Sequence, residues 1–194
     1  MANPVELLRR DRGSWQRERI LHPDQTPDLS GADLRGEILA GLDLSGVNLS
    51  GANLLGADLR RCNLTGADLS EAILSAAILS EADLRRADLC LAQLDRAVLV
   101  GANLTEAMLA EADLSFANLD QATLLRADLY RACGRGLSLR HTDLTHARGY
   151  GLDLREATLY GTDLRWAELP KLDLRGARVL EIRSDRANLR GLIQ

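Results

Sequence analysis

The chain has 194 residues, of which 46% are hydrophobic and only 3% aromatic, and its formal net charge is −4. This composition fits one domain with an aliphatic core, and it lacks the excess of basic residues that is typical of nucleic-acid-binding proteins. The charge is distributed unevenly, because residues 1–130 carry a net charge of −8 and residues 131–194 a net charge of +4. We expect no direct binding to nucleic acid.

The cysteines and the amino-terminal sequence indicate a cytoplasmic protein. Cys62, Cys90 and Cys133 follow no CxxC or metal-ligand spacing, as expected for reduced thiols. The first residues contain no apolar core of a signal peptide, and no hydrophobic run approaches the length of a membrane span. We therefore expect no secretion and no association with a membrane.

The segment before the repeats is expected to be helical. Asn3 is a suitable amino-terminal cap for a helix over residues 3–21, and Pro4 suits its first turn. Gly13 and Ser14 are the positions at which this segment would divide into two short helices. Five apolar side chains are expected to share one face of it or to lie beside that face: Val5, Leu7, Leu8, Trp15 and Ile20.

Two prolines, Pro23 and Pro27, mark the end of the helical segment, and the repeats follow at once. We expect residues 1–26 to form a helical cap and residues 27–194 to form one repeat domain.

A single five-residue unit is not stable alone. Burying one leucine contributes roughly 1.5–3 kcal/mol, whereas ordering the unit costs about 1.5 kcal/mol for each of its five residues. Such units are stable only when stacked, and their end coils need cover.

A leucine occupies every fifth position from Leu29 to Leu129, and the register continues without an insertion to Leu189. From Ala52 to Ala132 the residue two places before each leucine is alanine, with Cys62 as the exception, and the residue just before the leucine is usually Asp or Asn. A period of five matches neither an α-helix nor an alternating strand. It predicts a coil in which each unit forms one side and then turns, with the leucines and small residues inward and the Asp or Asn outward.

The units Ala32-Asp33-Leu34-Arg35-Gly36 and Ala102-Asn103-Leu104-Thr105-Glu106 resemble the signature of the pentapeptide-repeat family. The resemblance covers residues 27–192. It implies an all-β solenoid, a right-handed quadrilateral parallel β-helix with four units per coil and about eight coils. With about 4.8 Å between stacked strands, the rod would be roughly 40 Å long.

Departures from the repeat cluster in the second half of the chain. Glycine replaces the central leucine at Gly134 and Gly149, while the inward residues Leu137 and Leu152 are larger than alanine. We interpret these as compensating changes within the core.

No helix-length segment follows the last unit, so we expect an exposed edge there that allows a monomer or an end-to-end dimer.

No catalytic, cofactor or metal site is predicted, so we do not expect an enzyme. His141 and His146 are five residues apart, which places them on adjacent sides of a coil, where they diverge. The many aspartates follow from the repeat itself and do not indicate acid–base pairs. No phosphate-binding or dinucleotide-binding motif is present.

The outer surface offers a more promising site, because four units per coil place residues twenty apart directly above one another. Arg135, Arg155 and Arg175 would form one column, and Tyr130 and Tyr150 would stack. Arginine and aromatic residues are enriched at binding hot spots. The candidate contact surface is Tyr130, Arg135, Arg140, Tyr150, Arg155, Tyr160, Arg165, Trp166 and Arg175.

Two functions are compatible with these patterns. The first is a non-enzymatic scaffold that binds an unidentified protein partner through a rigid rod. The second is implied by the resemblance, since some family members imitate duplex DNA, bind DNA gyrase or topoisomerase IV, and protect cells against quinolones. A third interpretation gives the surface no partner: aspartates such as Asp153 and Asp173 neutralise the arginine columns, which then only stabilise the coils.

Overall fold

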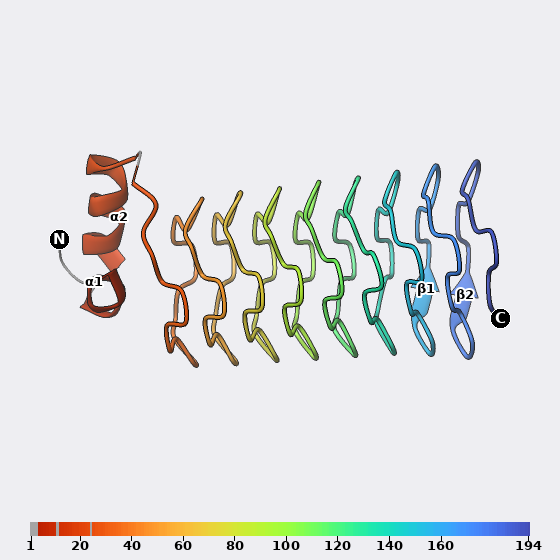
Figure 1. Cartoon of the computed structure of the whole chain (residues 1–194), viewed down its shortest axis with the longest axis horizontal. Helices are drawn as coiled ribbons and strands as arrows, with labels where there is room; N and C mark the ends of the chain where they lie inside the picture. The colour runs from red at the N-terminus through yellow and green to blue at the C-terminus, as the bar shows by residue number, and fades with distance from the viewer. Residues whose placement is uncertain (1–3, 11, 24) are drawn as a thin grey trace.

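The computed structural model describes residues 4–10, 12–23 and 25–194. Two short helices, α1 over Pro4–Arg10 and α2 over Arg12–Leu21, lie at one end of a rod of stacked coils (Figure 1). The rod ends at residue 194, opposite the helices. Among the described residues, no helix has the length and hydrophobicity needed to cross a membrane.

The coils stack with a register of twenty residues. Parallel bridges join each coil to the next, from Asp28 with Asn48 to Asp173 with Ile193. This register confirms four units per coil. We number the four sides by their first central residues, Leu29, Leu34, Leu39 and Leu44, and assign to each side the two corner residues that follow its central residue.

Within the part of the chain that the structure describes, only two segments form continuous strands, β1 over Thr158–Tyr160 and β2 over Arg178–Leu180, which pair in parallel. Elsewhere the sides are joined by isolated bridges, so the expectation of an all-β structure overestimated the strand content. The reason is geometric, because each side has three residues before the chain turns. The hydrogen-bonding ladder continues through the corners instead, as where the Gly31 N–H donates to the Ser50 carbonyl at 2.9 Å.

The core consists of the central leucines and the inward small residues. Every central leucine from Leu29 to Leu129 is at most 3% exposed. The inward alanines between Ala52 and Ala132 are buried as well, and their small side chains leave space for the leucines of neighbouring units. Burial ends in the last coil, where Val179 and Leu180 are exposed. The core is therefore a continuous aliphatic column along the rod, as predicted.

Every corner requires a left-handed backbone at its second residue. Twenty residues other than glycine have φ between 52° and 62°, and glycine occupies many of the remaining corners. Such a conformation is strained for a residue with a Cβ atom. It persists because the same residue hydrogen-bonds the next coil, as in the 3.0 Å bond from the Arg61 N–H to the Ser80 carbonyl.

The Asp or Asn before each leucine stabilises the corner that follows. Asp28 Oδ1 accepts the Ser30 N–H at 3.0 Å, and Asn48 Oδ1 accepts the Ser50 N–H at the same distance. A short side chain that accepts a hydrogen bond from the backbone two residues later favours a turn. The sequence analysis assigned these residues only a solvent-facing position, but they also hold the turn.

The helices contact the first coils through Trp15, which is 1% exposed and donates its Nε1–H to the Asp43 carbonyl at 2.8 Å. Leu8 is buried too, as the helical pattern predicted. One expectation was wrong: Gly13 does not divide the two helices but lies within α2, which begins at Arg12. Ile20, expected beside the apolar face, is 78% exposed. The predicted cap residue Asn3 lies outside the described residues.

Candidate interaction surface

Six Asp-Leu-Arg sequences form local ion pairs on the outside of the rod. In each, the arginine at the corner folds back onto the aspartate two residues before it, as in the 2.7 Å contact from Arg35 to Asp33. The Arg35 hydrogen bonds lower the pKa of Asp33 to about 2. The six pairs are Asp33–Arg35, Asp58–Arg60, Asp83–Arg85, Asp153–Arg155, Asp163–Arg165 and Asp173–Arg175.

These pairs include most of the arginines in the predicted contact surface. Arg155 and Arg175 contact their own aspartates at 2.6 Å, and Arg135 contacts Glu156 at 2.8 Å. Arg165 is paired in the same way with Asp163. The column of Arg135, Arg155 and Arg175 therefore lies on the second side as expected, but its charges are compensated within the chain.

The tyrosines of the first side stack between coils. The rings of Tyr130 and Tyr150 have centroids 6.1 Å apart and are inclined by 21°. The Lys171 ammonium lies 5.3 Å from the Tyr150 ring centroid and extends the group by one coil. The stacking of the two tyrosines is thus as predicted, whereas Lys171 was not recognised as part of it.

Trp166 is held between two neighbours at a corner of the fourth side. His146 stacks on it with a centroid distance of 5.9 Å and an interplanar angle of 9°, and the Arg186 guanidinium lies 4.3 Å from the ring centroid. Even so, 44% of Trp166 is exposed. The separation of twenty residues between His146 and Trp166 indicates this stack, which the interpretation of His146 as a possible metal ligand missed.

The remaining predicted residues lie on the third side. Tyr160 makes an edge contact with His141 at a centroid distance of 5.0 Å, while the Arg140 side chain has no ion pair among the described residues. The nine predicted contact residues are therefore distributed over all four sides. The structure brings together the members of each column but does not unite the nine in one surface.

The first side differs from the others in its charges. Its outward and corner positions form what we call the segregated strip, which has eleven charged residues and, among the described residues, no ion pair. Its first part is acidic: Asp28, Asp68, Glu71, Asp88, Glu111 and Asp128. Its second part is mainly basic: Arg131, Arg148, Glu168, Lys171 and Arg190. The separation of acidic from basic residues on the first side becomes clear only when residues twenty apart are compared. The net charges of the two halves of the chain only suggested it.

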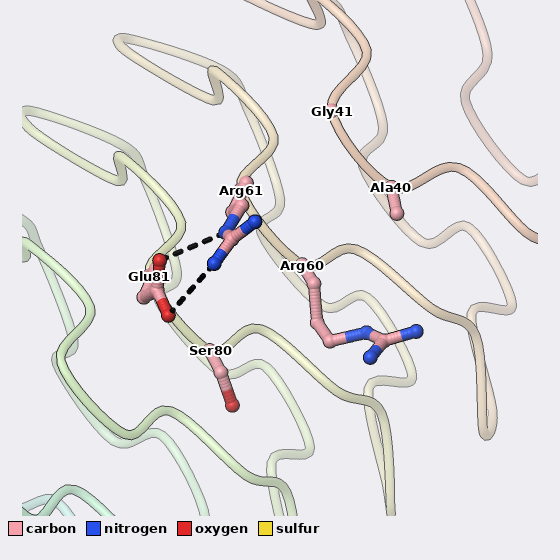
Figure 2. Close-up of a pocket in the computed structure, with 6 residues that line it drawn as sticks. All are labelled: Ala40, Gly41, Arg60, Arg61, Ser80 and Glu81. Carbon is pink, nitrogen blue, oxygen red and sulfur yellow. Dashed lines mark hydrogen bonds and ion pairs between the residues drawn. The ribbon is translucent and has the colours of Figure 1, made fainter.

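A polar hollow lies on the third side of the rod. It is lined by Arg60, Arg61, Ser80 and Glu81, and Figure 2 shows Arg61 directed at Glu81. Because Arg60 is paired with Asp58, neither guanidinium of this hollow is left for a bound anion. Among the described residues, no group of three His, Cys, Asp or Glu is arranged to hold a metal ion.

The repeat register, the leucine column and the corner geometry define a pentapeptide-repeat solenoid. The family model described as pentapeptide repeats matches in eight copies, over residues 28–66, 56–89, 91–124, 108–145 and 135–169. The chain belongs to this family, whose members fold as right-handed quadrilateral β-helices. Members are generally structural or interaction proteins and not enzymes.

Several solved structures are similar to the chain. HetL, a pentapeptide-repeat protein involved in heterocyst differentiation regulation in the cyanobacterium Nostoc sp. strain PCC 7120, is 32% identical over 93% of this chain and 95% of its own, with a TM-score of 0.34. Rfr23 from the cyanobacterium Cyanothece 51142 is 22% identical over 94% and 99%, with a TM-score of 0.31.

QnrB1, a plasmid-mediated fluoroquinolone resistance protein, is also among the similar structures. It is 21% identical over 87% of this chain and 82% of its own, with a TM-score of 0.41. No curated protein sequence matches the chain at the level required for a significant relationship.

Proposed function

We propose that the chain is a non-enzymatic scaffold that binds a protein partner on the outside of a rigid rod. The observation that carries this proposal is the state of Trp166, an exposed ring fixed on both faces by His146 and Arg186. Binding hot spots are enriched in tryptophan, tyrosine and arginine. A ring that is already immobilised loses little conformational entropy when a partner covers it.

Phe116 provides a matched control for Trp166. Both are aromatic second corner residues with a left-handed backbone, φ being 59° at Phe116 and 62° at Trp166, and both are exposed. Phe116 lies on the second side, before the basic part of the rod begins at residue 131. Replacing either ring by alanine therefore removes a similar exposed surface at a similar backbone position.

The experiment is affinity capture with cross-linking from cells that express the chain, followed by reconstitution with the purified candidate partner. We expect one partner to bind the wild type and the Phe116→Ala variant equally, and the Trp166→Ala variant at least tenfold more weakly. A partner that binds all three equally would refute the role of Trp166. If nothing reproducibly binds, the scaffold function itself is wrong.

We also propose that α1 and α2 act as the cap of the first coil, which makes residues 1–26 and 27–194 two structural parts. The support is the burial of Trp15 and Leu8 together with the hydrogen bond from Trp15 to the Asp43 carbonyl. Arg19 adds a 2.6 Å bond to the Ser45 carbonyl. These contacts cover apolar surface that the first coil would otherwise expose.

A second candidate function is binding to DNA gyrase or topoisomerase IV as a DNA mimic. It is favoured by the charge of residues 24–130, which carry 17 acidic residues and 7 arginines, a net charge of −10. These residues span about five coils, or roughly 25 Å, over which duplex DNA carries about 15 negative charges. The two charge densities are thus within a factor of about two.

A supercoiling assay with purified gyrase, with and without a quinolone, tests this candidate. A DNA mimic inhibits supercoiling or protects gyrase from the drug at micromolar concentration, and reversal of Glu71 and Glu111 to lysine weakens that effect. Unchanged supercoiling and unchanged drug sensitivity would eliminate this function. The scaffold proposal does not depend on the result, because its test uses Trp166.

A further inference from the structure

We propose that the segregated strip binds a second copy of this chain, giving a side-by-side antiparallel dimer. The middle of the strip is the place where exposed apolar side chains gather. Leu91 is 52% exposed and Met108 44%, and Tyr130 and Tyr150 follow on the next rows. Acidic residues precede this apolar centre and basic residues follow it, so the strip has complementary ends around a hydrophobic middle.

The charge order determines the direction of pairing. In a parallel arrangement the acidic part of one rod would face the acidic part of the other, which costs free energy. In an antiparallel arrangement each acidic part faces a basic part. A two-fold axis then relates the two copies, so the same patch serves both, as in most homodimers.

The antiparallel arrangement also has a specific register. A two-fold axis that crosses the strip between the rows of Met108 and Asp128 preserves lateral position, so corner residues of one copy face corner residues of the other. The outcome is three pairs of opposite charge, each present twice: Glu71 with Lys171, Asp88 with Arg148, and Glu111 with Arg131. One pair of like charge, Asp68 with Glu168, also results.

The rows that carry apolar side chains also lie opposite each other in this register, although the same lateral rule places Met108 opposite Asp128 and Leu91 opposite Gly151. The row of Leu91 lies opposite that of Tyr150, and the row of Met108 lies opposite that of Tyr130. Tyrosine supplies a large contact area with few rotatable bonds. The charged pairs therefore set direction and register, while the central rows supply the buried apolar surface.

The dimensions agree with a modest interface. Nine rows spaced by about 4.8 Å give a strip about 40 Å long, and a side with its corner is about 15 Å wide. This corresponds to roughly 600 Å² per copy, at the lower end of the range for specific protein interfaces. We therefore expect a dimer that forms at micromolar concentration and weakens as salt screens its charges.

Charge reversal at four corner residues provides the test, because these side chains are exposed and outside the core. Sedimentation equilibrium of the purified full chain over about 1–100 µM measures the dimerisation constant at low salt. We expect Glu71→Lys/Glu111→Lys and Arg131→Glu/Lys171→Glu each to weaken dimerisation at least tenfold. Mixing the two variants restores a dimer, since reversed ends then face each other.

Arg140→Glu/Arg178→Glu is the matched control, since it changes the net charge as much as Arg131→Glu/Lys171→Glu does but lies on the third side. It is expected to leave the dimerisation constant unchanged. Circular dichroism of each variant shows whether the fold is retained, and a variant that fails to fold is replaced by Lys171→Glu alone.

Small-angle X-ray scattering separates this dimer from an end-to-end dimer. A side-by-side dimer keeps nearly the length of one rod, whereas an end-to-end dimer is nearly twice as long. A monomer at 100 µM, an end-to-end dimer, or a dimer that all the reversals leave unchanged would overturn the proposal. The inference does not rest on the scaffold function, because every measurement uses the purified chain alone.

Discussion

Leu137 occupies the core space that Gly134 leaves free. A Cβ atom at position 134 would lie 3.0 Å from Leu137 Cδ2 and 2.8 Å from Leu154 Cδ2. The loss of a central leucine is thus compensated by the larger inward residue of the next unit, as the sequence predicted. At Gly149 the atoms nearest to an added Cβ belong to Leu169, at 2.9 Å, and Leu129, at 3.3 Å.

This contact predicts a cost for enlarging the glycine. Gly134→Ala is expected to lower the free energy of unfolding by about 1–3 kcal/mol, since the added methyl group overpacks the core. Denaturant titration followed by circular dichroism measures the change. Gly56→Ala measures a different cost, because a Cβ atom there has nothing within 4 Å but a φ of 64° strains an alanine.

A double-mutant cycle tests the compensation itself. Leu137→Ala alone is expected to cost about 2–5 kcal/mol, because it leaves a cavity. In its presence Gly134→Ala becomes less harmful, with a coupling of about 1 kcal/mol, since one of the two closest atoms is gone. Strictly additive free energies would show that Leu137 does not limit the space at position 134.

The contact between Trp15 and the Asp43 carbonyl predicts local unfolding of the first coils. Trp15→Phe removes the donor of a nearly buried hydrogen bond and is expected to cost about 1–3 kcal/mol. Trp15→Ala also removes a large buried side chain and is expected to cost about 3–5 kcal/mol. Hydrogen exchange is the suitable measurement, because coils of a solenoid interact mainly with their neighbours.

Protection is expected to fall first in residues 28–48 and to remain unchanged beyond residue 100. Trp166→Ala serves as the control, since this exposed ring lies outside the core. Equal loss of protection along the whole rod after Trp15→Ala would contradict a local role of the helices.

The aspartate–arginine pairs predict lower stability in acid. Hydrogen bonds from arginine lower the pKa of Asp33 from 3.8 to about 2 and also lower the pKa values of Asp83, Asp153, Asp163 and Asp173. The folded state then binds fewer protons than the unfolded state in acid. Their contribution is complete above pH 4 and is lost as the pH falls towards 2.

The denaturation midpoint between pH 7 and pH 2 tests this dependence. It is expected to be flat above about pH 4 and to decrease below it. Asp33→Asn keeps an oxygen acceptor for the turn but removes the titrating group, so its decrease should be smaller. A midpoint that rises between pH 4 and pH 2 would be incompatible with lowered aspartate pKa values.

Cys90 is expected to be an unreactive thiol. Its pKa is raised from 9.0 to about 11, mainly by burial and then by its hydrogen bond to Asp88. Because the thiolate is the nucleophile, alkylation by iodoacetamide should still be accelerating at pH 9–10, whereas a model thiol is approaching its plateau. Mass spectrometry of the peptide that contains Cys90 gives its rate separately.

Asp88→Asn removes the negative charge beside the thiol and is expected to shift the midpoint of the alkylation profile towards pH 9. A wild-type midpoint at or below pH 9 would show that neither burial nor Asp88 controls this cysteine.

Much of the candidate surface was predictable once the register was known. The stack of Tyr130 and Tyr150 follows from their spacing of twenty residues, and the same rule places His146 beside Trp166. Neutralisation of the arginine columns by Asp153 and Asp173 was one of the interpretations of the sequence. The ion pairs of Arg155 and Arg175 agree with it. The pairing of each arginine with the aspartate two residues before it was not predicted: Arg155 reaches Asp153 because the chain turns at this corner and brings the two side chains together.

The sequence by itself determined that the chain is a five-residue repeat with an aliphatic core, because only inward leucines at every fifth position bury enough apolar surface. The tertiary structure decided the twenty-residue register, since the number of units per coil depends on the corner angle. That angle comes from a left-handed backbone that residues such as Arg61 and Trp166 adopt against their intrinsic preference. Only this register shows which charges are paired and, within the described part of the chain, places eleven charged residues without an ion pair on the first side.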